Sequence, residues 1–265
     1  MSGFLHYAKL WLACVRYSVV RTMMFRGDFF MWSLVELFWM SVNLLLIGVI
    51  YRHTDSIAGW NQWEMTLLVG TSLLIQRLLM GFFWSNLFEM GRNVRSGAFD
   101  FFIAQPGHLL FMVSTRKIDL DGFLNVPIAI GVIVYSLQQL GLDPSSQQIL
   151  LYTLFILCGL FLHYATLLIF ISLVFWLQSA KGVEGGYFML NEFSRLPRAA
   201  LRGVASIVFV YTLPVAVVTN VPSQTLLHGV GVAESAWLLG VTAFWLTVSV
   251  IVFHCGIRRY TSASS

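Results

Sequence analysis

Residues 148–177 read Q-I-L-L-Y-T-L-F-I-L-C-G-L-F-L-H-Y-A-T-L-L-I-F-I-S-L-V-F-W-L and contain no Asp, Glu, Lys or Arg. An α-helix needs about 20 predominantly apolar residues to cross about 30 Å of hydrocarbon. A charge-free run of this length therefore predicts a membrane-spanning helix. The whole chain has the same character, because 58% of its 265 residues are hydrophobic and only 11% are charged. Soluble domains carry roughly 25% charge.

Five further stretches have a similar length and composition, which predicts an all-α polytopic membrane protein with six transmembrane helices. The predicted spans are residues 29–51, 64–88, 118–140, 148–177, 203–220 and 236–257. Residues 1–28 combine apolar side chains at helical spacing with scattered basic ones, which predicts an amphipathic helix lying in the membrane interface. We expect residues 1–265 to form a single transmembrane domain.

The basic residues predict the orientation of the chain. Fourteen of the 16 Lys and Arg residues lie in residues 1–28, 89–117, 178–202 and 258–259. Loops rich in Lys and Arg remain on the cytoplasmic side of a membrane. Both termini and the two long internal segments are therefore predicted to be cytoplasmic.

Two prolines interrupt the predicted fifth span and the segment that follows it. Pro214 lies within residues 203–220, and Pro222 lies just after them. Backbone groups freed by proline are tolerated in a membrane where they are buried in protein or line a cavity. Residues 221–235 are therefore predicted to form a helical or re-entrant element at the outer face, with an ordinary loop as the alternative.

Three ionisable side chains, Glu36, Arg77 and His163, lie within predicted spans. Such residues are costly in hydrocarbon and are candidates for a functional role. At 1.5 Å per residue, Glu36 lies about 12 Å, and Arg77 about 16 Å, from the inner end of its helix. An ion pair between them is geometrically possible, and it would either lock two helices together or take part in substrate passage. For His163 a packed, hydrogen-bonded role is favoured over a proton relay.

Motifs of soluble and intramembrane enzymes are missing from the sequence. It contains no phosphate-binding loop, no His-Glu-x-x-His and no Gly-x-Ser-x-Gly, so the chain does not bind ATP through the usual loop. Three cysteines without pair or metal-ligand spacing predict neither a disulfide framework nor a zinc site.

Residues 89–108 read E-M-G-R-N-V-R-S-G-A-F-D-F-F-I-A-Q-P-G-H, which is too apolar for a linker and too interrupted for a span. This mixture predicts an interfacial helix whose exposed aromatic side chains contact a cytoplasmic partner. An interfacial helix that contacts only lipid is the alternative.

Within this segment, V-R-S-G-A-F-D-F-F-I-A-Q-P at residues 94–106 resembles the I-R-x-G-x-L-D-x-x-L-x-x-P signature of ATP-binding-cassette type-2 export permeases. Phe99 stands where that signature has its first leucine. The ending G-I-R-R-Y-T-S-A-S-S at residues 256–265 is similar to that of a six-span subgroup, which includes proposed viologen exporters. The spans and the basic N-terminus fit this family along nearly the whole chain.

The resemblance implies an exporter in which two permease chains, identical or related, join a dimer of separate ATPase subunits. This chain would then be a non-catalytic permease of the bacterial inner membrane, surrounded by lipid and binding no nucleic acid. It would hold no cofactor, because ATP and Mg²⁺ would bind the partner ATPase. Alternating access would move an amphipathic or hydrophobic substrate out of the cytoplasm.

The resemblance also implies roles for particular residues. Residues 89–117 would couple the ATPase to the spans, chiefly through Arg95, Gly97, Phe99, Asp100 and Pro106. The first, second and fifth spans would line the translocation path, with Trp39, Met80, Phe83 and Pro214 as candidate lining residues.

Other function classes remain open at this point. A secondary transporter or channel acting without an ATPase usually has paired broken helices in repeated halves, whereas only one broken region is evident here. A membrane-embedded enzyme lacks its catalytic groups in this sequence. An accessory membrane subunit without its own pathway is a further alternative.

Overall fold

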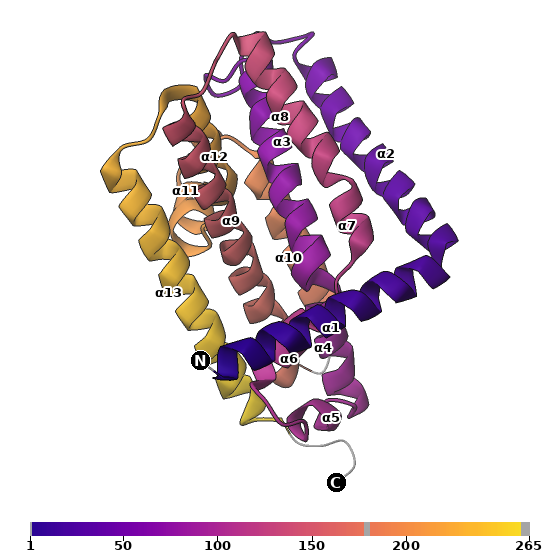
Figure 1. Cartoon of the computed structure of the whole chain (residues 1–265). Helices are drawn as coiled ribbons and strands as arrows, with labels where there is room; N and C mark the ends of the chain where they lie inside the picture. Colours follow the sequence, from indigo (N-terminus) through magenta and orange to yellow (C-terminus); the bar gives the residue numbers. More distant parts are fainter. Residues whose placement is uncertain (1, 178–180, 261–265) are drawn as a thin grey trace.

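The computed structural model describes residues 2–177 and 181–260, and every regular element in those ranges is a helix (Figure 1). Five helical segments of the described chain are long and apolar enough to cross a membrane. They are α2 (Arg26–Ile50), α3–η1–α4 (Gln62–Leu79, Met80–Trp84 and Ser85–Ser96), α7–α8 (Leu120–Leu124 and Val126–Leu140), α9–η2 (Ser146–Ser172 and Leu173–Phe175) and α13 (Val232–Ile257). The predicted all-α polytopic membrane fold is confirmed.

Two of these helical segments form the centre of the bundle. In the most apolar part of Gln62–Ser96 and of Ser146–Phe175, 72% of the residues are buried. In the corresponding part of α2 or α13, 22% of the residues are buried. α9 packs against α13, α12 (Val217–His228) and α3, and α3 packs against α8. The central pair is therefore enclosed by protein, while α2 and α13 leave most of their apolar surface to the surroundings, as lipid-facing helices do.

At one end of the bundle, α1 (Ser2–Met24) runs across the ends of other helices and contacts α6 (Leu109–Thr115) and α7 (Figure 1). The short helix α5 (Asp100–Ile103) lies at the same end, which we call the α5 end. Exposed apolar side chains of α1 include Leu12 and Met23. The placement of this helix in a membrane interface stays a prediction, as does the assignment of the α5 end to the cytoplasm.

The predicted fifth span, residues 203–220, is wrong as a continuous helix. α11 (Val204–Ser206) and the π-helix η5 (Ile207–Thr212) end before Pro214, and α12 begins only at Val217. Proline has no N–H to donate, and its ring clashes with the carbonyl four residues earlier. α12 then extends to His228, so three residues, 229–231, separate it from α13. The predicted outer element 221–235 is thus divided between the buried helix α12 and the start of α13.

The prediction that residues 178–202 are a cytoplasmic segment is also wrong over its described part. α10 (Lys181–Glu192), η3 (Phe193–Arg195) and η4 (Arg198–Ala200) enter the bundle. Tyr187 on α10 contacts His163 in the second half of α9, and Thr225 on α12 accepts a hydrogen bond from Gln148 near the start of α9. α10 and α12 therefore lie beside opposite halves of α9, where a single fifth span was expected. Residues 178–180 lie outside the described residues.

Arg195 illustrates the consequence for the predicted orientation. Its guanidinium hydrogen-bonds Asn43 on α2 and Gln76 on α3, both of which lie well inside their helices. Counting Arg195 among the cytoplasmic basic residues was wrong, because polar side chains of α2, α3 and α10 bind its guanidinium within the bundle. Positive charge predicts the side of a membrane only for residues that stay in its loops.

Candidate functional site

A cavity of about 920 Å³, which we call cavity A, lies between α2, α3–η1, α7 and α10. Its lining combines aromatic and charged side chains. The aromatic ones are Trp32, Trp39, Trp84 and Phe188, and the charged ones are Glu36, Arg77, Asp119, Asp121, Glu192 and Arg195. This volume is in the range of small-molecule binding sites, which are mostly apolar with a few convergent polar groups.

The candidate path residues are divided between this cavity and the packed interior. Trp39 and Met80 line cavity A. Phe83 packs against the ring of Tyr164 instead, with 4.6 Å between ring centroids. Pro214 is buried at the break between η5 and α12 and is not among the residues that line cavity A. Only the first two therefore face a space that a substrate could occupy.

The structure brings Glu36 and Arg77 together on the wall of cavity A. Arg77 Nη1 donates a hydrogen bond to Glu36 Oε2, and the two side chains are 6% and 10% exposed. Asn125 Nδ2 donates to the same carboxylate oxygen at 3.4 Å, while Arg77 Nε is buried and has no hydrogen-bond partner. Each charge compensates the other in a region with little water, so removal of either one would leave an unpaired buried charge.

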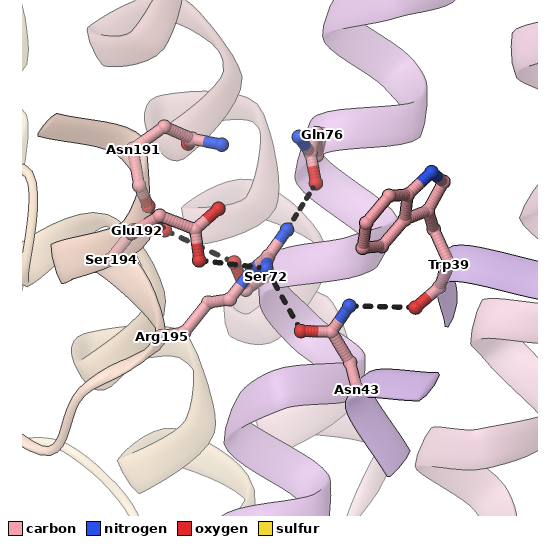
Figure 2. A network of polar contacts seen from close by, with 8 residues as sticks. All are labelled: Trp39, Asn43, Ser72, Gln76, Asn191, Glu192, Ser194 and Arg195. Atoms are coloured by element: carbon pink, nitrogen blue, oxygen red, sulfur yellow. Dashed lines mark hydrogen bonds and ion pairs between the residues drawn. The ribbon is translucent and has the colours of Figure 1, made fainter. Parts of the chain in front are cut away.

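A second polar network surrounds Arg195 (Figure 2). Its Nη1 donates to Asn43 Oδ1 at 2.9 Å and to Glu192 Oε2 at 3.0 Å, and its Nη2 donates to Gln76 Oε1 at 3.0 Å. Asn43 Nδ2 donates in turn to the Trp39 carbonyl oxygen at 2.7 Å, which directs the Asn43 amide oxygen toward the guanidinium. One arginine thus connects α2, α3 and α10.

Arg195 and Arg77 differ in the exposure of their acidic partners. The Glu192 side chain is 64% exposed, whereas that of Glu36 is 10% exposed. Arg195 Nε is buried without a hydrogen-bond partner. The ion pair formed by Arg77 is therefore enclosed by protein. The carboxylate of Glu192 is accessible, so another polar group in the cavity can replace it as a partner of Arg195.

The backbone beside Arg195 is fixed by small polar side chains. The hydroxyls of Ser194 and Ser72 are hydrogen-bonded at 3.1 Å, and Thr219 Oγ1 donates to the Ser194 carbonyl oxygen. Asn220 on α12 donates to the Leu196 carbonyl oxygen at 2.9 Å. These contacts satisfy backbone groups that the end of the α10–η3 helix would otherwise leave unpaired in the bundle interior.

The end of cavity A nearest α5 lies beside the π-helix η1, where α7 approaches closely. A Cβ atom on Gly122 would lie 2.8 Å from the Gly81 backbone nitrogen, and Asp119 N donates to Gly81 O at 3.0 Å. Burial raises the pKa of the Asp119 carboxyl, although a hydrogen bond from Ser85 opposes the shift. Single turns of π-helix are rare and frequently lie at functional sites.

The predicted coupling residues lie at the α5 end. Gly97 ends α4 with φ 76°, a left-handed conformation that favours glycine. Arg95 and Pro106 are exposed, and Asp100 begins α5. Phe99, expected on the surface, is 0% exposed and packs among Phe102, Phe175 and Tyr260.

Phe101 and Ile103 are the large apolar side chains that residues 89–117 expose. They are 75% and 47% exposed, respectively. The prediction of an exposed aromatic surface was therefore correct in kind but wrong about Phe99. We call the surface formed by Arg95, Phe101, Ile103 and Pro106 the α5 surface.

His163 is buried in α9, and its Nδ1 lies 3.3 Å from the Tyr187 hydroxyl. It is not among the residues that line cavity A, which agrees with a packing role.

Sequence reasoning missed Asn43, Gln76, Glu192 and Arg195 as site residues. Asn43 and Gln76 are polar residues within otherwise apolar spans, and this was a usable signal. Arg195 and Glu192 gave no such signal, because they follow a glycine-rich, charged stretch that is typical of a loop.

A family model described as ABC-2 family transporter protein matches residues 37–264. The match includes most of α2, both arginines of cavity A and the whole α4–α6 segment. No curated protein and no solved structure matches the chain.

Proposed function

This chain belongs to the ABC-2 family of transporter proteins and is a transmembrane permease subunit, and from this premise we propose that it exports an amphipathic or hydrophobic substrate, driven by a separate ATPase. Permeases of this family are normally non-catalytic. ATP and Mg²⁺ would then bind the partner ATPase. The bacterial inner membrane is the proposed location, with both termini in the cytoplasm.

Cavity A is the observation that carries the proposal. It lies between α2, α3–η1, α7 and α10, holds about 920 Å³, and is lined by four aromatic and six charged side chains. Aromatic rings offer a surface for an apolar body, and the charged groups offer partners for a polar head. A substrate with both parts fits this lining better than a small hydrated ion does.

The α5 surface is the proposed contact with the ATPase. It exposes Phe101 and Ile103 beside Arg95 at one end of the bundle. The buried side of the same segment packs Phe99 against Phe175 and Tyr260 at the ends of α9–η2 and α13. Movement imposed on the α5 surface would therefore pass directly to two spanning helices.

A second permease, identical or related, is proposed to cover the open side of cavity A. Glu192 lies beside Arg195, inside the length of α2 and α3, yet its side chain is 64% exposed. An ionised carboxylate facing hydrocarbon at this depth is unfavourable. A second copy would replace lipid at this face and enclose a hydrated pathway between the two chains.

Transport in inside-out vesicles tests the proposal. Vesicles holding this chain and its ATPase subunit are expected to accumulate a fluorescent amphipathic dye, rhodamine 6G, when ATP is added. Orthovanadate, which blocks ATP hydrolysis, is expected to abolish accumulation, and Phe101→Ala is expected to reduce it at unchanged protein level. Uptake driven by an ion gradient without the ATPase subunit would instead identify a secondary transporter.

A further inference from the structure

A second cavity lies next to cavity A in the groove between α2 and α3. This cavity B holds about 350 Å³, and it is lined by residues nearer the end of the bundle opposite α5, including Ile50, Ile57, Met65 and Val69. The two cavities share a boundary. The residues that line both are Asn43, Leu46, Glu192 and Arg195.

The Arg195 network closes this boundary. The guanidinium bonds Asn43 on one side of the groove and Gln76 on the other, and Glu192 holds it from its own helix (Figure 2). Along the α3–η1 segment, Val69 lines cavity B, whereas Leu73, Gln76 and Met80 line cavity A. The boundary on this segment falls between Val69 and Leu73. Asn43, Leu46, Glu192 and Arg195 therefore form a septum across the groove, and Gln76 binds Arg195 from the cavity A side.

The hydrogen bonds that hold Arg195 in the septum can be broken and replaced by others. Two of the three acceptors are neutral amide oxygens, and the third belongs to the largely exposed Glu192. Arg195 Nε lacks an acceptor altogether. A polar group arriving from cavity A can therefore supply hydrogen bonds that replace those to Asn43 and Gln76, at little cost to the guanidinium.

The two sides of the septum are held by different numbers of contacts within the bundle. Ser194, next to Arg195, is fixed to Ser72 and Thr219. α2, by contrast, is among the least buried spans. Displacement of α2 would break the Asn43–Arg195 bond while the backbone beside Arg195 stays in place.

We propose that Arg195 is the gate of the pathway: bonded to Asn43 and Gln76 it separates the two cavities, and released from them it joins cavity A to cavity B. The use of this gate in transport rests on the proposed function. The barrier itself is a property of the fold, and it is testable without ATP or substrate.

Cysteine labelling from each face of the membrane tests the barrier. The natural residues Cys14, Cys158 and Cys255 are first replaced by serine, and Met80→Cys or Val69→Cys is introduced as the reporter in the full chain with its partners. A membrane-impermeant methanethiosulfonate reagent is applied to right-side-out and inside-out vesicles. With Arg195 present, each reporter is expected to react from one face only, and the two from opposite faces.

Arg195→Ala is expected to abolish this sidedness, so that both reporters react from both faces. Asn43→Ala removes a single acceptor and is expected to give a partial loss, which provides a milder variant should Arg195→Ala fold poorly. Arg202→Ala is the matched control, because Arg202 is an exposed arginine of the same segment that lines neither cavity.

Two results would overturn the proposal. One is labelling of both reporters from the same face while Arg195 is intact. The other is one-sided labelling that persists in both Arg195→Ala and Asn43→Ala. Because neither result depends on ATP or dye, a failed gate is distinguishable from a failed transport function.

Discussion

Neutralising Arg77 is the sharpest test of how cavity A is held together. In Arg77→Met the Glu36 carboxylate loses its Nη1 donor and keeps only Asn125 Nδ2, at 3.4 Å. Both members of the pair are at least nine-tenths buried. Removing one partner of a buried ion pair costs about 3–5 kcal/mol, so Arg77→Met is expected to lower the free energy of unfolding by about 3–5 kcal/mol. SDS titration of the purified protein, followed by circular dichroism, measures this change.

The double variant Glu36→Leu/Arg77→Met tests whether the unpaired Glu36 carboxylate causes the loss of stability. Replacing both charges by apolar residues of similar volume is often neutral or stabilising, so much of the loss should be recovered. Lys117→Met is the matched control, because the Lys117–Glu89 pair is 2.5 Å long but its side chains are 25% and 31% exposed. Partly exposed pairs contribute about 0–1 kcal/mol. Additive losses in the double variant, or a loss from Arg77→Met no larger than the control's, would refute the reasoning.

Four further substitutions have definite expected outcomes. Phe99→Ala empties a fully buried ring position and is expected to cost about 3–5 kcal/mol, measured by the same titration, whereas Phe101→Ala should leave stability unchanged and reduce only ATPase coupling. Gly122→Ala places a Cβ 2.8 Å from the Gly81 nitrogen and is expected to cost about 1–3 kcal/mol through overpacking. Burial raises the pKa of Asp119 from 3.8; the folded state thus binds the proton more tightly, and stability falls as pH rises from 3.8 to the raised value. Asp119→Asn should remove that part of the pH dependence of the thermal midpoint.

The long spans were predictable because lipid imposes one requirement on all of them. Each needs enough consecutive apolar residues to cross the hydrocarbon, and residues 148–177 satisfy this without any neighbour's help. The second span was predicted to end at residue 88, but its helix continues to Ser96. Helix beyond the hydrocarbon carries charges such as Arg92 and Arg95, so hydropathy does not reveal where it stops.

The broken region was predictable only in part, because tertiary contacts decide it. Pro214 correctly indicated an interruption. The entry of α10 into the bundle had no local signal, since Gly185, Gly186 and Lys181 are typical of a loop. Its packing depends on particular partners instead: Gly186 lies against Phe170, and Tyr187 lies against His163. The amino-acid composition of a segment does not reveal such complementarity between helices that lie far apart in the sequence.

The two arginines of cavity A show how one residue type acquires two roles. Arg77 faces a carboxylate that is itself buried, so its charge is compensated wherever the substrate is. Arg195 faces Glu192, whose side chain is largely exposed, and two amides that lie on α2 and α3. An ion pair with a buried partner does not readily change partners, because its separation would leave two unpaired charges in a medium of low dielectric constant. A charge held by exposed or neutral partners can pass from one set of acceptors to another. The first arrangement fixes α2 to α3 on the α5 side of the septum, and the second allows the junction between the two cavities to open while that contact holds.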